Sequence, residues 1–282
     1  MDRERTEGAE VANAKPAEYE IVPFPRMRHL VIDLLRAAHP RHMIHGLIEV
    51  DVTRSRQYIR EQEASTGEQL SFTAFVATCL CKAIDMNKYL HAVRNWRGQL
   101  VLFDEVDVNT MIEVEFGGRK QPMGHIFRAV NKRTYRDIND EMQTAQAVGG
   151  RGEGGTTLRK FASLPRFIRA PFHWLRDKNP RIAKQYAGTV ALTAIGMFGE
   201  GGGWGIPLAS HTLCVTLGGI AEKPGVVDGR IEIREYLSLT VTFDHDIIDG
   251  APAARFAERF KGLIERGYGL MELDTGAGVT AA

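Results

Sequence analysis

The stretch YLSLTVTFDHDIIDGAPAARF, residues 236–256, joins a strand pattern, a polar turn and the start of a helix. Hydrophobic and polar residues alternate up to the turn, which predicts a β-strand with one buried face. After Pro252, hydrophobic residues recur at helical spacing, which predicts an amphipathic helix. The turn holds His245, and the carboxylate of Asp249 follows four residues later. A histidine held by scaffold on both sides suits a general base that must meet its substrate in one orientation.

The composition is that of an ordinary globular chain. Its 282 residues are 44% hydrophobic and 25% charged, which excludes fibrous and wholly disordered proteins. The formal net charge of +1 gives no global attraction to nucleic acid or to an anionic membrane. No apolar stretch approaches the roughly 20 residues of a spanning helix, and residues 1–5 lack the apolar core of a signal peptide. We therefore expect a cytoplasmic protein that binds neither nucleic acid nor membrane.

The cysteines and the clustered histidines do not predict a metal site. The three cysteines form no C-x-x-C motif and are odd in number, so we expect buried thiols rather than disulfides. Histidines recur at positions 39, 42 and 45, but Pro40 and Gly46 interrupt the segment, and no carboxylate stands at ligand spacing. No metal is therefore expected.

The hydrophobic pattern predicts one α/β domain at residues 21–272, between a flexible arm at 1–20 and a flexible tail at 273–282. Ser71 is expected to cap a central helix, and Thr134 with Asp137 predicts the start of another. Strands are expected at 47–52, 106–116, 190–195, 212–217 and 236–243, and helices at 27–35, at 53–64 and after 71, 134 and 252.

The region 149–186 differs from the rest of the chain. Five glycines fall between Gly149 and Gly155, and a run rich in aromatic and basic residues follows. Residues 151–184 hold nine Lys and Arg against two carboxylates, a net charge of about +7 in a chain whose total is +1. Pro165 and Pro171 are expected to break this atypical insertion into short pieces. It is either a solvated surface segment or a binding surface for an anionic partner that has an apolar part.

The motif Asp244-His245-x-x-x-Asp249-Gly250, followed by APAARF, resembles the signature of the dihydrolipoamide acyltransferases of 2-oxoacid dehydrogenase complexes. Its His-x-x-x-Asp-Gly part is also similar to that of chloramphenicol acetyltransferase. Three other segments resemble the same catalytic domain, and the likeness extends over residues 22–146 and 187–270. These segments are VPFPRMR at 22–28, GTVALTAIGMFG at 188–199 and GGIAEKP at 218–224.

The resemblance implies a chloramphenicol acetyltransferase-like α/β fold, a mixed sheet flanked by helices. It implies a homotrimer, or a multiple of trimers, with active sites between subunits. The implied reaction is transfer of an acyl group between coenzyme A and a dihydrolipoamide-type thiol. Coenzyme A or acyl-CoA is then a substrate, and no metal takes part.

The resemblance also assigns roles to single residues. His245 becomes the base that takes the proton of a thiol, and Thr193 becomes the hydroxyl that donates to the oxyanion. Asp249, followed by the glycine of the turn, Gly250, matches a carboxylate that forms a structural salt bridge, here with Arg28 or Arg26. A carboxylate facing the N-terminus of the following helix is the other interpretation of Asp249.

The chain departs from the family at several points. Asp246 stands where the family usually has arginine, which adds a negative charge beside the base. About twenty residues precede the resemblance, too few for a lipoyl domain, so we expect a lipoyl group or acyl carrier on another protein. Two alternatives stay open: acetylation of a small hydroxyl or amine acceptor, and a non-catalytic trimeric scaffold of a larger complex. For the basic insertion the alternatives are a solvated segment without a partner and a surface for acyl-CoA phosphates, for a carrier protein or for a lipid surface.

Overall fold

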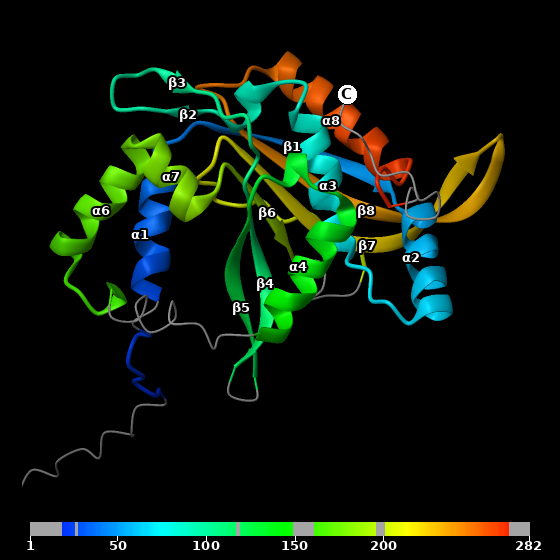
Figure 1. Ribbon diagram of the computed structural model, residues 1–282, viewed down its shortest axis with the longest axis horizontal. Helices are drawn as coiled ribbons and strands as arrows, with labels where there is room; N and C mark the ends of the chain where they lie inside the picture. Colours follow the sequence, from blue (N-terminus) through cyan, green and yellow to red (C-terminus); the bar gives the residue numbers. More distant parts are fainter. Residues whose placement is uncertain (1–18, 26–27, 117–118, 149–160, 196–200, 271–282) are drawn as a thin grey trace, which may run out of the picture.

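A six-stranded mixed sheet forms the centre of the computed structural model, which describes residues 19–25, 28–116, 119–148, 161–195 and 201–270 (Figure 1). The strand order is β1-β8-β7-β6-β4-β5; β6 runs parallel to both neighbours, and the other pairs are antiparallel. The strands are β1 (Met43–Asp51), β4 (Val108–Phe116), β5 (Arg119–Phe127), β6 (Val190–Ala194), β7 (Leu213–Val227) and β8 (Arg230–Asp244), and a separate hairpin pairs β2 (Val93–Arg94) with β3 (Leu100–Val101).

Helices flank the sheet, as the sequence predicts. Figure 1 shows α3, α4 and α8 in front of the sheet, with α1, α6 and α7 grouped at one side. The helices are α1 (Arg28–Ala38), α2 (Thr53–Thr66), α3 (Phe72–Ile84), α4 (Tyr135–Val148), α6 (Arg166–Lys178), α7 (Pro180–Ala187) and α8 (Gly250–Glu265), with short 3-10 turns at Lys88–His91 and Val130–Lys132.

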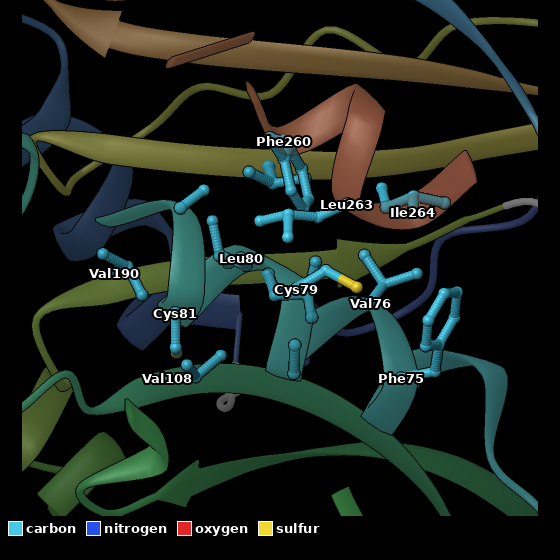
Figure 2. Packing of buried hydrophobic residues seen from close by; sticks show 14 of the residues in the cluster. Phe75, Val76, Cys79, Leu80, Cys81, Val108, Val190, Phe260, Leu263 and Ile264 are labelled. Carbon is cyan, nitrogen blue, oxygen red and sulfur yellow. The ribbon is translucent and has the colours of Figure 1, made fainter. Parts of the chain in front are cut away.

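The main core lies where α3 packs between α8 and the sheet. Figure 2 shows side chains of α3 between Phe260 and Leu263 of α8 and the strand residues Val108 and Val190. Nearly every residue of α3 is buried, as its broad apolar face predicts. The predicted start of this helix is confirmed, since the Ser71 side chain accepts a hydrogen bond from the backbone of Ala74 at 3.2 Å.

The opposite face of β8 carries buried hydroxyl side chains, and Gly202 and Gly203 lie against that of Ser238. Ser238 Oγ accepts a hydrogen bond from Gly203 N at 3.1 Å, and Trp204 Nε1 donates to the carbonyl of Ile48 at 3.2 Å. A Cβ atom at Gly218 would lie 2.0 Å from the Gly203 carbonyl oxygen. Glycine is therefore required at 218 for this segment to approach the sheet.

The β7–β8 hairpin is much longer than the sequence predicts. Its turn has positive φ at Asp228 (50°) and Gly229 (78°), the conformation of a tight two-residue hairpin turn. Because β1 pairs with β8 only from Tyr236 onward, the distal half of the hairpin extends beyond the sheet (Figure 1). Val226, Ile231 and Ile233 are exposed there.

The α6–α7 segment, residues 166–187, corrects one expectation. Pro165 precedes α6, but Pro171 lies inside it, so this proline does not break the helix. Packing overrides the cost of the missing donor, because α6 is held by a buried ion pair. Arg169 Nε lies 3.0 Å from Asp33 Oδ2 of α1, and its guanidinium donates to the carbonyl of Ala162 at 2.9 Å.

Several other expectations can be compared with the structure. The strand β5 was not predicted, and β7 and β8 exceed their predicted ranges. The arm up to residue 18, the glycines at 149–155 and the tail lie outside the described residues, so the predicted domain limits remain predictions. Within the described ranges, no helix combines the length and apolarity that crossing a bilayer requires.

Candidate active site

His245 lies directly after β8, at the start of the turn that precedes α8. We call residues 244–250 the His245 turn. The backbone N–H of His245 donates to the carbonyl of His42 at 2.7 Å, which ties the turn to the segment before β1. The imidazole is 44% exposed, and its Nδ1 atom lies 3.8 Å from Asp249 Oδ1. The base candidate is thus fixed through its backbone while its ring is open to a substrate.

Asp244 anchors the base of the turn. Its carboxylate is buried and accepts a hydrogen bond from the Arg41 guanidinium at 2.9 Å. The same carboxylate accepts from the backbone N–H of Asp246 at 3.1 Å, and its carbonyl accepts from Ile248 N at 3.0 Å. Ile248 is buried in the core, so the turn is held from both ends.

Asp246 is not an isolated negative charge beside the base. Its Oδ1 atom lies 2.9 Å from His42 Nδ1, and its Oδ2 atom lies 4.0 Å from the Arg94 guanidinium. The hydrogen bond with His42 is the main reason why the pKa of Asp246 lies below its usual value. The departure from the family at this position is therefore accompanied by a histidine and an arginine that face the carboxylate.

Thr193 lies on β6, far from His245 within one chain. It pairs with Thr216 of β7, which pairs with Thr240 of β8. His245 is thus two strands away and five residues further along, roughly 15–20 Å at ordinary strand dimensions. One tetrahedral intermediate needs both groups within hydrogen-bond reach. A single chain therefore does not bring the two predicted catalytic side chains together.

The structure also shows no salt bridge between Asp249 and the predicted partner Arg28 among the residues that it describes. Asp249 is 87% exposed, and His245 is its only ion-pairing neighbour among the described residues. Arg28 is exposed at the first position of α1, and Arg26 lies outside the described ranges. Asp249 directly precedes α8, which begins at Gly250, so it stands where a carboxylate favourably meets a helix N-terminus.

A cavity of about 360 Å³ opens between the His245 turn and the α6–α7 segment. Asp244 and Asp246 line it, whereas His245 does not. Sequence reasoning missed Arg41 and Arg94, which line it as well, because they reach the turn only through the fold. The only signal in the sequence was the positive charge of residues 151–184, which supply Arg176 and Lys178 to the opposite wall.

The described residues offer no group of three ligands for a metal ion. His42 faces Asp246, and His45 Nδ1 lies 2.9 Å from the hydroxyl of Thr242. The three cysteines are free and buried; burial raises the pKa of Cys214 to about 12 and those of Cys79 and Cys81 above their usual value. These thiols are protonated at neutral pH and are not nucleophiles.

Comparison with known proteins confirms the resemblance indicated by the motif. Residues 161–272 match the family model of the 2-oxoacid dehydrogenase acyltransferase catalytic domain. This range contains α6, α7, Thr193 and the His245 turn. Among curated relatives, the lipoamide acyltransferase component of the branched-chain alpha-keto acid dehydrogenase complex of Pseudomonas aeruginosa is 35% identical over 79 residues, 27% of this chain and 18% of the relative.

A second relative is the human mitochondrial dihydrolipoyllysine-residue succinyltransferase component of the 2-oxoglutarate dehydrogenase complex. It is 27% identical over 135 residues, 47% of this chain and 29% of the relative. The chain therefore spans less than a third of the length of either relative.

Solved structures confirm the fold class. The probable dihydrolipoamide acetyltransferase of Listeria monocytogenes superposes with a TM-score of 0.65 at 17% identity, over 95% of this chain and 99% of the other. The dihydrolipoamide acetyltransferase of Azotobacter vinelandii gives a TM-score of 0.66 at 17% identity, over 94% and 99% of the two chains. The mixed sheet flanked by helices is thus the fold of these acyltransferase structures.

Proposed function

We propose that this chain, which carries the catalytic-domain match of the 2-oxoacid dehydrogenase acyltransferases, transfers an acyl group between coenzyme A and a dihydrolipoamide-type thiol. The observation that carries the proposal is the placement of His245. Its backbone is fixed by the His42 carbonyl and by the buried Asp244–Arg41 pair, while its ring is open at the surface. Such a histidine can remove a proton from an incoming thiol in one defined orientation.

The proposed reaction uses two side chains. His245 takes the thiol proton, and the resulting thiolate attacks the carbonyl carbon of the acyl thioester. The Thr193 hydroxyl donates a hydrogen bond to the oxyanion of the tetrahedral intermediate. When the carbon–sulfur bond to the first carrier breaks, the protonated His245 returns its proton to the departing thiolate, so the enzyme ends in its starting state.

The distance between Thr193 and His245 supports a site shared by two copies of the chain. Neither copy alone can place both groups on one intermediate, whereas a closed ring of three gives each His245 a neighbouring Thr193. We therefore propose a homotrimer, or a multiple of trimers, in which each active site lies between subunits. The lipoyl group would come from a partner protein or domain.

Acyl transfer from acetyl-CoA, succinyl-CoA and a branched-chain acyl-CoA to free dihydrolipoamide tests the reaction, measured as release of free coenzyme A. At least one acyl-CoA should support turnover, and His245→Ala should abolish most of it. Absence of turnover with every acyl-CoA, in a protein of trimeric mass that binds coenzyme A, would overturn the enzymatic proposal and favour a scaffold.

Mixed trimers test the shared site. His245→Ala and Thr193→Val chains are each inactive in this scheme, but random co-assembly of equal amounts pairs an intact His245 with an intact Thr193 in about one quarter of the sites. Co-expressed trimers should therefore recover about a quarter of wild-type activity. No recovery in trimers shown by mass spectrometry to be mixed would contradict a site built from two subunits.

A further inference from the structure

The cavity between the His245 turn and the α6–α7 segment has features that the proposed reaction does not use. One wall is the turn itself, through Asp244, Asp246 and Ile247. The opposite wall comes from α6, α7 and the residues that follow, and β2 contributes a third side. At about 360 Å³ the cavity is within the size range of small-molecule sites.

Positive charge exceeds negative charge around this cavity. Among the described side chains, its lining has four cationic groups against two carboxylates. Both carboxylates already have partners: Asp244 pairs with Arg41 at 2.9 Å, and Asp246 contacts His42 at 2.9 Å and Arg94 at 4.0 Å. The cationic residues are Arg41, Arg94, Arg176 and Lys178. The fold therefore gathers cations from three separate segments of the chain around a single hollow, where an anion would be stabilised.

The rest of the lining is suited to an organic ligand rather than to a free ion. Trp174, Val93, Pro40 and Ile247 give the cavity apolar surface beside its cations. Trp174 is 62% exposed at its rim, where an aromatic or aliphatic group of a ligand can lie against it. An anion with an attached apolar part matches both kinds of surface.

We propose that this cavity is an anion subsite, in which Arg94, Arg176 and Lys178 hold a phosphate or carboxylate group of the acyl-transfer substrate. The inference rests on the proposed function, because it takes the ligand to be a substrate of the His245 site. Asp244 and Asp246 are the chain neighbours of His245, so a group bound in the cavity lies next to the turn that carries the base. The anion is either a phosphate of coenzyme A or a carboxylate on the acyl group.

The test compares ligands that differ in their phosphate and carboxylate groups. Calorimetry measures the affinities of coenzyme A, 3′-dephospho-coenzyme A, pantetheine, acetyl-CoA and succinyl-CoA at low and high salt. The variant is Arg176→Gln with Lys178→Gln. The matched control is Arg181→Gln, an exposed cation on α7 outside the cavity lining. Melting temperatures check that each variant is folded.

If the bound anion is a phosphate, we expect the wild-type protein to bind coenzyme A at least about ten-fold more tightly than a probe lacking phosphate. The double variant should lose this preference. If the bound anion is a carboxylate, we expect the wild-type protein to bind succinyl-CoA more tightly than acetyl-CoA by the same factor, and the double variant to lose that preference. In either case the salt dependence of binding becomes weaker in the double variant, and Arg181→Gln behaves like the wild type.

The proposed subsite would be excluded if the double variant bound all five ligands with the affinity and salt dependence of the wild-type protein. An equal loss in Arg181→Gln would also overturn it, because the effect would then follow overall charge. The proposed function fails separately. If the wild-type protein shows the charge preference in calorimetry but transfers no acyl group, the proposed subsite stands and the proposed reaction is excluded.

Discussion

The His245 turn and the α6–α7 segment face each other across one cavity, yet backbone pairing has a larger part in holding the turn than in holding the segment. The turn continues a strand that is paired on both sides, by β1 and by β7, and it leads into a helix packed on the core. The α6–α7 segment has many exposed apolar side chains and is attached through side-chain contacts with other segments. Asp33 of α1 lies 3.0 Å from Arg169, Glu105 lies 2.7 Å from Lys184, and the Arg128 guanidinium donates to the carbonyl of Lys184 at 2.8 Å.

This difference assigns different tasks to the two walls. Backbone pairing fixes a side chain to within the small tolerance that proton transfer requires. Side-chain ion pairs hold a surface in place but can be varied without disturbing the sheet.

Removal of the base should have the largest effect. His245→Ala is expected to lower acyl transfer by about 10²–10⁴, the usual contribution of a positioned general base, with coenzyme A affinity nearly unchanged. Steady-state kinetics and calorimetry measure the two quantities. His39→Ala, which removes an exposed histidine outside the turn, is the control. A variant that retains more than a tenth of wild-type activity would exclude His245 as the base.

Removal of the ion pair that anchors α6 should affect stability before chemistry. Arg169→Met leaves Asp33 buried without its guanidinium, and about 3–5 kcal/mol of unfolding free energy should be lost in this region. Hydrogen exchange should then increase in α1 and α6 but not in β8. Arg166→Met at the exposed start of α6 is the control. Unchanged exchange in α6 would mean that apolar packing alone holds the segment.

His91 should make the junction between α7 and β6 sensitive to acid. It is buried beside Thr189, and burial lowers the pKa of His91 to about 4. In the unfolded chain this histidine takes up a proton below about pH 6.5, but in the folded chain it does so only near pH 4. Stability is therefore intact above pH 6.5 and falls by about 3 kcal/mol as the pH drops to 4.

Unfolding measured from pH 7.5 to pH 4 in the wild type and in His91→Gln checks this expectation. The variant should lose most of this pH dependence, whereas His39→Gln, at an exposed site, should retain it. An equally steep acid loss in His91→Gln would assign the effect to other groups.

Asp249→Asn should have the smallest effect on stability. Because the carboxylate is exposed, removal of its charge at the start of α8 should lower the melting temperature by only about a degree or two. The measurement is a thermal melt with activity assayed in parallel. A large loss of stability would indicate a buried salt bridge formed in the assembled protein, as the family resemblance implies.

Part of β8 and the start of α4 could be predicted because their local patterns agree with their final environment. Strict alternation predicted residues 236–243 of β8, and the reciprocal hydrogen bonds of Thr134 and Asp137 confirm the predicted start of α4. The strand β5 gave no such signal, since it contains Pro122 and Gly124, which a strand at the edge of a sheet tolerates. Pairing with β4 defines this strand.

The site could be predicted only in part, for a similar reason. His245 and Thr193 belong to recognisable motifs, but their separation appears only once the strand register is known. Arg41 and Arg94 lie about 200 and 150 residues before the turn, and no periodicity connects them with it. The continuity of α6 through Pro171 depends on a partner in α1, which is also distant in the sequence.

The strand order determines how long each strand must wait for its partner while the chain is being synthesised. Ile44 of β1 pairs with Phe243 of β8, so β1 leaves the ribosome about 200 residues before its partner. At about 5–20 residues per second, its edge stays open for on the order of 10–40 s. The parallel pairing of β4 with β6 can form only after about 80 further residues have been synthesised. Folding is therefore expected to be slow and to finish only after β8 emerges, which makes the nascent chain a client for chaperones that cover unpaired strands.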